Sequence, residues 1–231
     1  MVVAAIIGYL LLSSPLLGHN VAPTTSTRSS SFSATTTASK PIILYVNQGN
    51  GVVNGSNLNS LLQVASSHGF NTIFFQIYRS GTLLFTDGAL TQFAAAAHGQ
   101  GLRIFFALYF TNSTQKIPSS IYADGEDGIN LDMSTLPLAT QTGLFSSLSS
   151  AYSGQTAITT TDPTLALSPS LLVVETYGAG GEQYVHRGII ASVGVFATSG
   201  SQDYAQQFKY ALDNSDGVMV FDYAGLVKAG Y

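Results

Sequence analysis

The sequence lacks cysteine and is poor in charge. The absence of cysteine among 231 residues excludes disulfide bonds, thiolate nucleophiles and cysteine-ligated zinc. Charged residues make up only 9% of the chain, against roughly 25% in ordinary soluble domains. The surface must therefore be built largely from Ser, Thr, Asn, Gln and Tyr. Such a surface suits an extracellular protein and the binding of sugars through neutral hydrogen bonds and aromatic faces, although adaptation to the host's habitat explains it equally well.

Several informative motifs are missing as well. The eight Lys and Arg are scattered and the formal net charge is −4, so no nucleic-acid partner is expected. No Gly-x-Ser-x-Gly occurs, which removes support for a serine hydrolase. No glycine-rich phosphate loop follows the first expected strand, which argues against a nucleotide-using α/β enzyme. The four histidines are dispersed, so we expect neither a metal site nor another cofactor.

The first 39 residues have the composition of an appendage. Residues 2–18 are apolar, which is short for a membrane-spanning helix and long for the apolar region of a signal peptide. Residues 22–39 form a Ser/Thr-rich tract that is typical of a flexible tether. We expect residues 1–21 to be a signal peptide or membrane anchor, 22–39 a linker and 40–231 the folded domain. The protein is then secreted or displayed at the cell surface and contacts a membrane only through its N-terminus.

From residue 40 onward, short apolar runs alternate with amphipathic runs. The expected strands cover residues 41–46, 71–78, 102–110, 156–161, 171–177, 188–197 and 217–221. The expected helices cover residues 58–68, 90–98, 138–152 and 203–212. Apolar strands that alternate with helices are typical of a parallel sheet covered on both faces. The pattern predicts a compact α/β domain of the (β/α)8 TIM-barrel type, with its eighth strand within residues 111–134 or near residue 165.

Carboxylates at strand ends are the candidate catalytic groups. In a TIM barrel the site lies at the C-terminal ends of the strands, and Asp162, Glu175 and Asp222 each stand where an expected strand ends. Glycoside hydrolysis needs a carboxylic acid and a second carboxylate that acts as nucleophile or base. Asp162 and Glu175 lie on consecutive strands, so we predict Glu175 as the acid/base and Asp162 as the nucleophile or its helper. The competing interpretation is that such carboxylates cap helices or pair with Arg79.

Polar and aromatic residues at equivalent strand ends are candidates for contacts to a sugar. The predicted substrate-binding residues are Gln76, Arg79, Tyr109, Tyr177, Asp222 and Tyr223. Carbohydrate is the partner that this set favours, and the sequence leaves its identity and the oligomeric state open.

Three segments resemble a poorly characterised family of glycoside-hydrolase-like TIM barrels. Residues 69–86 read GFNTIFFQIYRSGTLLFT, with the Gly-Phe-Asn-Thr opening, Phe-x-Gln core and Arg-x-x-Gly exit of that family's second strand. Residues 95–110 (AAAHGQGLRIFFALYF) and 129–148 (INLDMSTLPLATQTGLFSSL) are similar to later units of the family. The resemblance implies that Asp132 belongs to a loop and that Asp162 ends the strand with the family's acidic site residue. The Asp-Gly that precedes that acid in the family is absent here.

A second alignment leads to a different expectation. Residues 127–134 read DGINLDMS, which resembles the Asp-Gly-x-Asp-x-Asp-x-Glu strand of family 18 chitinases with Ser134 in place of the catalytic Glu. This alignment implies an inactive barrel. We prefer the first alignment, because too little chain separates residues 127–134 from the third strand to hold a helix. A glycosidase is therefore the predicted function, with a non-catalytic carbohydrate-binding or cell-surface structural barrel as the alternative.

Overall fold

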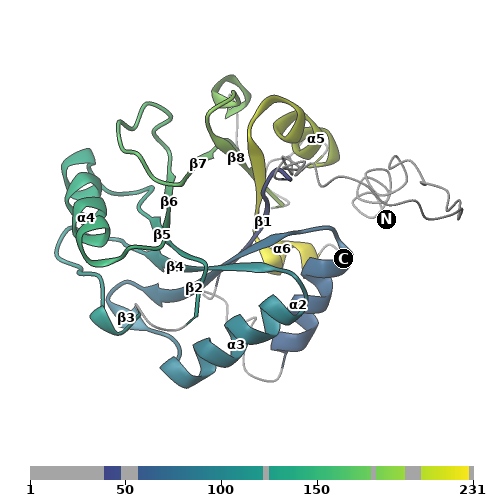
Figure 1. Ribbon diagram of the computed structural model, residues 1–231. Helices are drawn as coiled ribbons and strands as arrows, with labels where there is room; N and C mark the ends of the chain where they lie inside the picture. The colour runs from purple at the N-terminus through teal and green to yellow at the C-terminus, as the bar shows by residue number, and fades with distance from the viewer. Residues whose placement is uncertain (1–38, 48–56, 122–124, 178–180, 196–203, 229–231) are drawn as a thin grey trace, which may run out of the picture.

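The domain is a closed barrel of eight parallel strands. The computed structural model describes residues 39–47, 57–121, 125–177, 181–195 and 204–228. Its barrel strands are β1 (Ile42–Val46), β2 (Thr72–Arg79), β4 (Arg103–Tyr109), β5 (Gly128–Asp132), β6 (Gln155–Thr160), β7 (Leu171–Glu175), β8 (Ile190–Gly194) and β9 (Gly217–Phe221). Their order is β1-β9-β8-β7-β6-β5-β4-β2, and pairing of β1 with β2 closes the ring (Figure 1). The predicted TIM-type barrel is confirmed.

Helices cover the outside of this ring (Figure 1). They are α2 (Leu58–Ser67), α3 (Asp87–Gly99), α4 (Leu138–Ala151), α5 (Tyr204–Asn214) and α6 (Tyr223–Lys228). The first four correspond to the four helices that the sequence predicts. Two connections contain only short 3₁₀ helices in their described parts, η2 (Ser119–Ile121) and η3 (Gly181–Tyr184). Residues 161–170, which join β6 to β7, form no helix.

Side-chain alternation along the strands separates two apolar cores. The larger core lies between the strands and the helices and contains residues such as Leu61, Phe93 and Phe208. The smaller core fills the barrel itself with alternate residues of the strands: Ile43, Tyr45, Phe74, Phe105, Ala107, Ala157, Val173, Ile190 and Met219. Gly128 belongs to this interior, because a Cβ at that position would collide with the ring of Phe105. The barrel is therefore a packed core, and only its ends are open to ligands.

Strand β5 corrects the preferred alignment of the sequence. Asp132 is the last residue of β5, paired in register with Tyr109 on one side and Thr159 on the other, and not part of a loop. The objection that no helix fits before this strand does not hold, because the described part of the connection from β4 needs only the 3₁₀ turn η2. The eighth strand thus lies within residues 111–134, one of the two places that the sequence allows.

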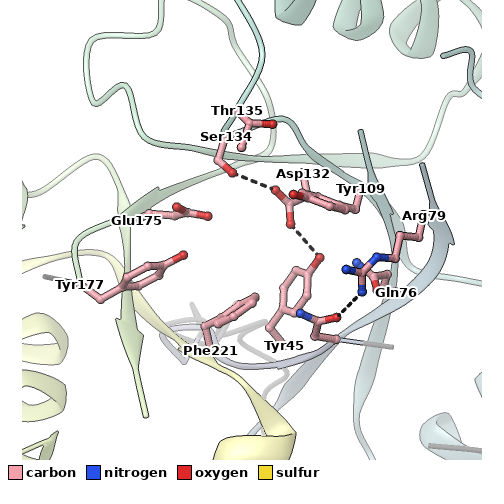
Figure 2. A pocket seen from close by; sticks show the side chains of 11 residues that line it. Tyr45, Gln76, Arg79, Tyr109, Asp132, Ser134, Thr135, Glu175, Tyr177 and Phe221 are labelled. Atoms are coloured by element: carbon pink, nitrogen blue, oxygen red, sulfur yellow. Dashed lines mark hydrogen bonds between the residues drawn. The ribbon is translucent and has the colours of Figure 1, made fainter. Parts of the chain in front are cut away.

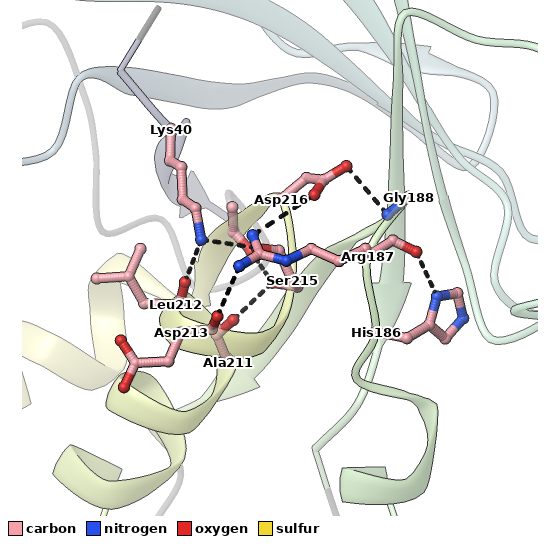
Figure 3. A network of polar contacts seen from close by, with 10 residues as sticks. Lys40, His186, Arg187, Gly188, Ala211, Leu212, Asp213, Ser215 and Asp216 are labelled. Atoms are coloured by element: carbon pink, nitrogen blue, oxygen red, sulfur yellow. Dashed lines mark hydrogen bonds and ion pairs between the residues drawn. The ribbon is translucent and has the colours of Figure 1, made fainter. Parts of the chain in front are cut away.

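Polar contacts at the N-terminal end of the barrel tie the last elements together (Figure 3). Lys40 Nζ donates to the carbonyl oxygens of Leu212 and Ser215, at 2.6 and 2.9 Å. Arg187 donates to the carbonyls of Ser215 and Asp213, at 2.7 and 3.0 Å. These carbonyls belong to the C-terminal turn of α5 and the residue after it, where cations stabilise the helix dipole. The base of the barrel is thus fastened by cation-to-backbone contacts.

The predicted anchor (residues 1–21) and all but the last residue of the predicted linker (22–39) lie outside the described residues. In the part of the chain that the structure describes, no helix has the length and apolar character to cross a membrane. The secreted or cell-surface location stays a prediction.

Candidate functional site

A polar pocket opens at the C-terminal ends of the strands (Figure 2). Its volume is about 270 Å³, and it is lined by Tyr45, Asn47, Gln76, Arg79, Tyr109, Asp132, Ser134, Thr135, Glu175, Tyr177 and Phe221. These residues come from the ends of β1, β2, β4, β5, β7 and β9. Their convergence follows from the topology, because parallel strands end at the same rim of a barrel.

Asp132 is the most deeply buried acid of the pocket. It is 4% exposed, and its Oδ2 accepts a hydrogen bond of 2.8 Å from the hydroxyl of Tyr45. The hydroxyl of Ser134 lies 3.4 Å from Oδ1. Loss of hydration, followed by the nearby charge of Glu175, raises the pKa of Asp132 to about 7, against the lowering effect of the Tyr45 and Ser134 hydrogen bonds. A large fraction of Asp132 is therefore protonated at neutral pH.

Glu175 faces Asp132 from the other side of the pocket (Figure 2). It ends β7 and is partly buried. Burial raises the pKa of Glu175, while hydrogen bonds from Tyr177 and Ser134 lower it. Burial and the charge of Glu175 in turn raise the pKa of Tyr177, which stays a neutral phenol. The charge of Glu175 contributes to the raised pKa of Asp132, so the two carboxyl groups titrate as an interacting pair.

Aromatic rings form the apolar side of the pocket. The rings of Tyr45 and Phe221 have centroids 5.0 Å apart, and those of Tyr177 and Phe221 have centroids 6.0 Å apart. The ring of Tyr109 lies under the guanidinium of Arg79, at 5.8 Å from its centroid. The pocket thus combines aromatic faces with carboxyl, amide and hydroxyl groups, which is the usual make-up of a small-molecule site.

The structure brings together five of the eight predicted site residues. Glu175 and the predicted substrate-binding residues Gln76, Arg79, Tyr109 and Tyr177 all line the pocket. Their roles stay predictions, but the rule that places the site at strand ends located them correctly in space.

Asp162 does not line this pocket. Strand β6 ends at Thr160, so Asp162 lies in the following loop. Its Oδ1 accepts hydrogen bonds from the backbone N–H and the hydroxyl of Thr164, at 2.8 and 2.7 Å. This is a local turn of the kind that Asp commonly stabilises. Asp132, and not Asp162, is therefore the second acid that lines the pocket with Glu175.

Asp222 and Tyr223 also lie outside the set of pocket-lining residues. Phe221 lines the pocket, whereas Asp222 follows the last residue of β9 and its side chain contacts α6. Its Oδ1 accepts a 3.0 Å hydrogen bond from the N–H of Gly225 in the first turn of α6. Burial raises the pKa of Asp222, against that hydrogen bond. Tyr223 begins α6 and packs in the outer apolar core.

The sequence reasoning missed four pocket residues of obvious chemical interest, namely Tyr45, Asp132, Ser134 and Phe221. The signal for Asp132 was present in the chitinase-like segment 127–134. It was set aside because too little chain separates this segment from the third strand to hold a helix. Asn130 and Asp132 also interrupt the apolar run of β5. Both are buried, and Asn130 Oδ1 accepts a hydrogen bond of 3.1 Å from Thr159. The polar residues of β5 that face the barrel interior therefore make this strand hard to recognise from the sequence.

Comparisons with solved structures identify other barrels with the same fold. The chain matches a noncanonic maltogenic α-amylase from Thermotoga neapolitana with a TM-score of 0.52 at 12% identity, covering 80% of this chain and 67% of that one. It matches the spore cortex-lytic enzyme SleL of Bacillus cereus with a TM-score of 0.52 at 11% identity, covering 79% and 70%. An HpcH/HpaI aldolase from Desulfitobacterium hafniense gives a TM-score of 0.50 at 6% identity, covering 82% and 89%.

At these identities the likeness is one of fold. No protein-family model matches the chain, and no curated protein matches it. The three barrels include different chemistries, so the function of this chain must be argued from its own pocket.

Proposed function

We propose that the domain is a glycoside hydrolase in which Asp132 is the general acid and Glu175 is the catalytic carboxylate. The observation that carries this proposal is the pair of acids in one pocket, where burial and the nearby charge of Glu175 raise the pKa of Asp132 to about 7. Two carboxyl groups whose environments separate their ionisation are what this reaction needs.

The strand geometry supports this pairing. Strands β5 and β7 are separated by β6 alone, so their backbones lie about 10 Å apart. The side chain of Ser134 hydrogen-bonds to both carboxyl groups, which makes them neighbours in the pocket. Glycosidases place their acids about 5–10 Å apart, with the shorter separation in retaining enzymes and the longer in inverting ones.

The proposed reaction uses groups that are already positioned. Asp132 donates its proton to the glycosidic oxygen as the bond to the anomeric carbon breaks, and Tyr45 stabilises the resulting carboxylate through its hydrogen bond. Glu175 attacks the anomeric carbon or removes a proton from the attacking water. The Tyr177 hydroxyl holds Glu175, and the aromatic rings of the pocket offer faces for the sugar. Two of the barrels with the same fold, the amylase and the cortex-lytic enzyme, are consistent with this chemistry.

One feature favours a second candidate function, which is sugar binding without hydrolysis. In the chitinase-like segment, the position of the catalytic Glu is occupied by Ser134. Ser134 lines the pocket and contacts Asp132, so the acid that family 18 chitinases use is absent from its place. A binding barrel at the cell surface would retain the pocket and lack turnover.

The deciding experiment is a hydrolysis assay of the full chain on a panel of aryl glycosides and oligosaccharides, with Glu175→Gln and Asp213→Asn as paired variants. Loss of the catalytic carboxylate is expected to reduce kcat by about 10²–10⁴-fold. Asp213 lies at the base of the barrel and pairs with Lys209, so its variant should keep full activity. Turnover that survives in Glu175→Gln would refute the mechanism, and sugar binding without any turnover would favour the second function.

A further inference from the structure

Arg79 supplies the positive charge of the pocket, and no carboxylate among the described residues forms an ion pair with it. Among the described lining residues it is the only Lys or Arg. It forms no ion pair with a described carboxylate, although Asp132 and Glu175 line the same pocket. Its guanidinium donates to Asn47 Oδ1 at 3.3 Å and covers the ring of Tyr109. A guanidinium has five N–H donors, so several of them make no hydrogen bond to a described residue and are left for a ligand.

The backbone aims Arg79 at the mouth through a local irregularity. Gln76 pairs with Ala107, but Tyr78 pairs with Leu108, so β2 contains a bulge between Gln76 and Tyr78. Gln76 lines the pocket, whereas Ile77 and Tyr78 both pack in the outer core. The extra residue reverses the alternation of side chains, and Arg79 therefore points inward, which a regular strand would not allow.

A tight hairpin holds this end of β2 in place. Ser80 and Gly81 have φ angles of 51° and 97° and connect β2 to the short antiparallel strand β3 (Thr82–Leu83). Two central residues with positive φ are the requirement of a two-residue hairpin turn. Arg79 is itself paired with Thr82. The side chain thus projects from a braced segment.

The arrangement of charges around the pocket gives the direction of binding. Figure 2 shows Arg79 and Gln76 on one side of the pocket, Glu175 and Tyr177 on the opposite side, and Asp132 and Tyr45 between them. A substrate whose scissile bond lies between the two acids therefore presents another part of its ring to Arg79. A planar guanidinium fork matches a carboxylate better than it matches any neutral hydroxyl.

We infer that the sugar unit bound in this pocket carries a carboxylate, as in a uronic acid, and that Arg79 binds this carboxylate. This inference rests on the proposed function, because it names the substrate class of the same pocket. Arg79 is then a specificity-determining residue that distinguishes an acidic sugar from its neutral counterpart.

The test measures binding rather than turnover. The full chain with Asp132→Asn, which mimics the protonated acid, is titrated with methyl β-D-glucuronide and with methyl β-D-glucoside, followed by NMR or calorimetry. The charged hydrogen bonds to Arg79 are expected to make the glucuronide bind about tenfold to a hundredfold more tightly. The difference should shrink at high salt. Arg79→Gln on the same background should reduce glucuronide binding to the level of the glucoside.

Arg79→Lys serves as the matched variant, because it keeps the charge and loses the planar fork. An intermediate preference is expected for it. Equal affinities for the two glycosides, a preference that survives in Arg79→Gln, or no binding of either one would overturn the inference. Failure of the proposed function is read separately, as the absence of turnover in the hydrolysis assay, so the two results are distinguishable. Thermal melting of each variant confirms that it is folded.

Discussion

The two ends of the barrel handle charge in opposite ways. At the base, Lys40 and Arg187 donate to backbone carbonyls around the end of α5. Asp127 accepts a hydrogen bond from the N–H of Ile104 and contacts His98 at 2.9 Å. At the mouth, Asp132 and Glu175 are withdrawn from water and form no ion pair with a described Lys, Arg or His.

The charged groups at the base therefore stabilise the fold, whereas the buried carboxyl groups at the mouth destabilise it. A charge paired with backbone groups near the surface contributes to stability, whereas a carboxylate buried without a cation opposes folding when it ionises. Protein sites keep such groups where chemistry needs a shifted pKa. In TIM barrels the mouth is the functional end and the base is the stabilising end, and the electrostatics of this chain follow the same division.

The contrast between mouth and base would be refuted most clearly if the acids at the mouth were not needed for activity. We expect Asp132→Asn to reduce kcat on a hydrolysed glycoside by about 10²–10⁴-fold, because the acid can no longer supply a proton. Asp162→Asn is the decisive counterpart, since the sequence predicts Asp162 as a site residue and the structure places it in a surface turn. Activity of Asp162→Asn within about twofold of the wild type is expected, because Asp162 is only partly buried and lies outside the pocket. A large loss in Asp162→Asn with an active Asp132→Asn would restore the pairing predicted from the sequence.

The stability of Asp132→Asn tests whether the buried carboxyl group opposes folding when it ionises. In the folded chain the pKa of Asp132 is about 7, above the value of about 3.9 for an unfolded Asp. The folded state therefore binds the proton more tightly, and Asp132 lowers stability as pH rises from about 4 to about 7. Asp132→Asn should raise the free energy of unfolding by about 2–4 kcal/mol at pH 8 and leave it nearly unchanged at pH 4.

Urea denaturation of both proteins at the two pH values measures this effect. A variant that is less stable than the wild type at pH 8 would show that the Tyr45 hydrogen bond outweighs burial, and the contrast between mouth and base would then disappear for this residue.

A substitution at the base of the barrel should lower the free energy of unfolding, whereas Asp132→Asn at the mouth should raise it. Lys40→Met keeps the apolar stem but removes the donor to Leu212 and Ser215, and we expect it to lower the free energy of unfolding by about 1–3 kcal/mol. Hydrolytic activity per folded molecule should be unchanged. Lys228→Met, at an exposed position in the last turn of α6, is the control and should shift stability by less than about 0.5 kcal/mol. Thermal or urea unfolding together with a single activity measurement checks both halves of the expectation.

The smallest expected effect sharpens the role of Tyr45. Its hydrogen bond lowers the pKa of Asp132, so Tyr45→Phe should move the alkaline limb of the pH profile of kcat/KM to higher pH, by about 1 unit or less. The proton donor then survives to higher pH, although the acid becomes a weaker catalyst. A shift to lower pH, or no shift with an otherwise active enzyme, would show that Asp132 is not the group that limits activity on that side.

Part of the site could be predicted from the sequence because strand ends are readable. The apolar runs of β2 and β7 end at Arg79 and Glu175, and the barrel topology requires such residues to meet at one rim. The same reasoning missed Asp132, since β5 carries the inward-facing polar residues Asn130 and Asp132 and has only two apolar residues. Asp222 also follows a strand, but it does not line the pocket. A position at a strand end does not by itself show which way the side chain points.

The sequence by itself determined the class of fold, through alternating apolar and amphipathic runs whose periodicity is a local property of the chain. It also indicated five of the eleven residues that line the pocket at the barrel mouth. Only the tertiary structure decided which carboxylates share a pocket, how far burial raises the pKa of Asp132 and which way Arg79 points. Those properties depend on the parity of each strand, a single bulge and the removal of water by neighbouring strands. They arise from contacts between residues distant in sequence, which no local pattern encodes.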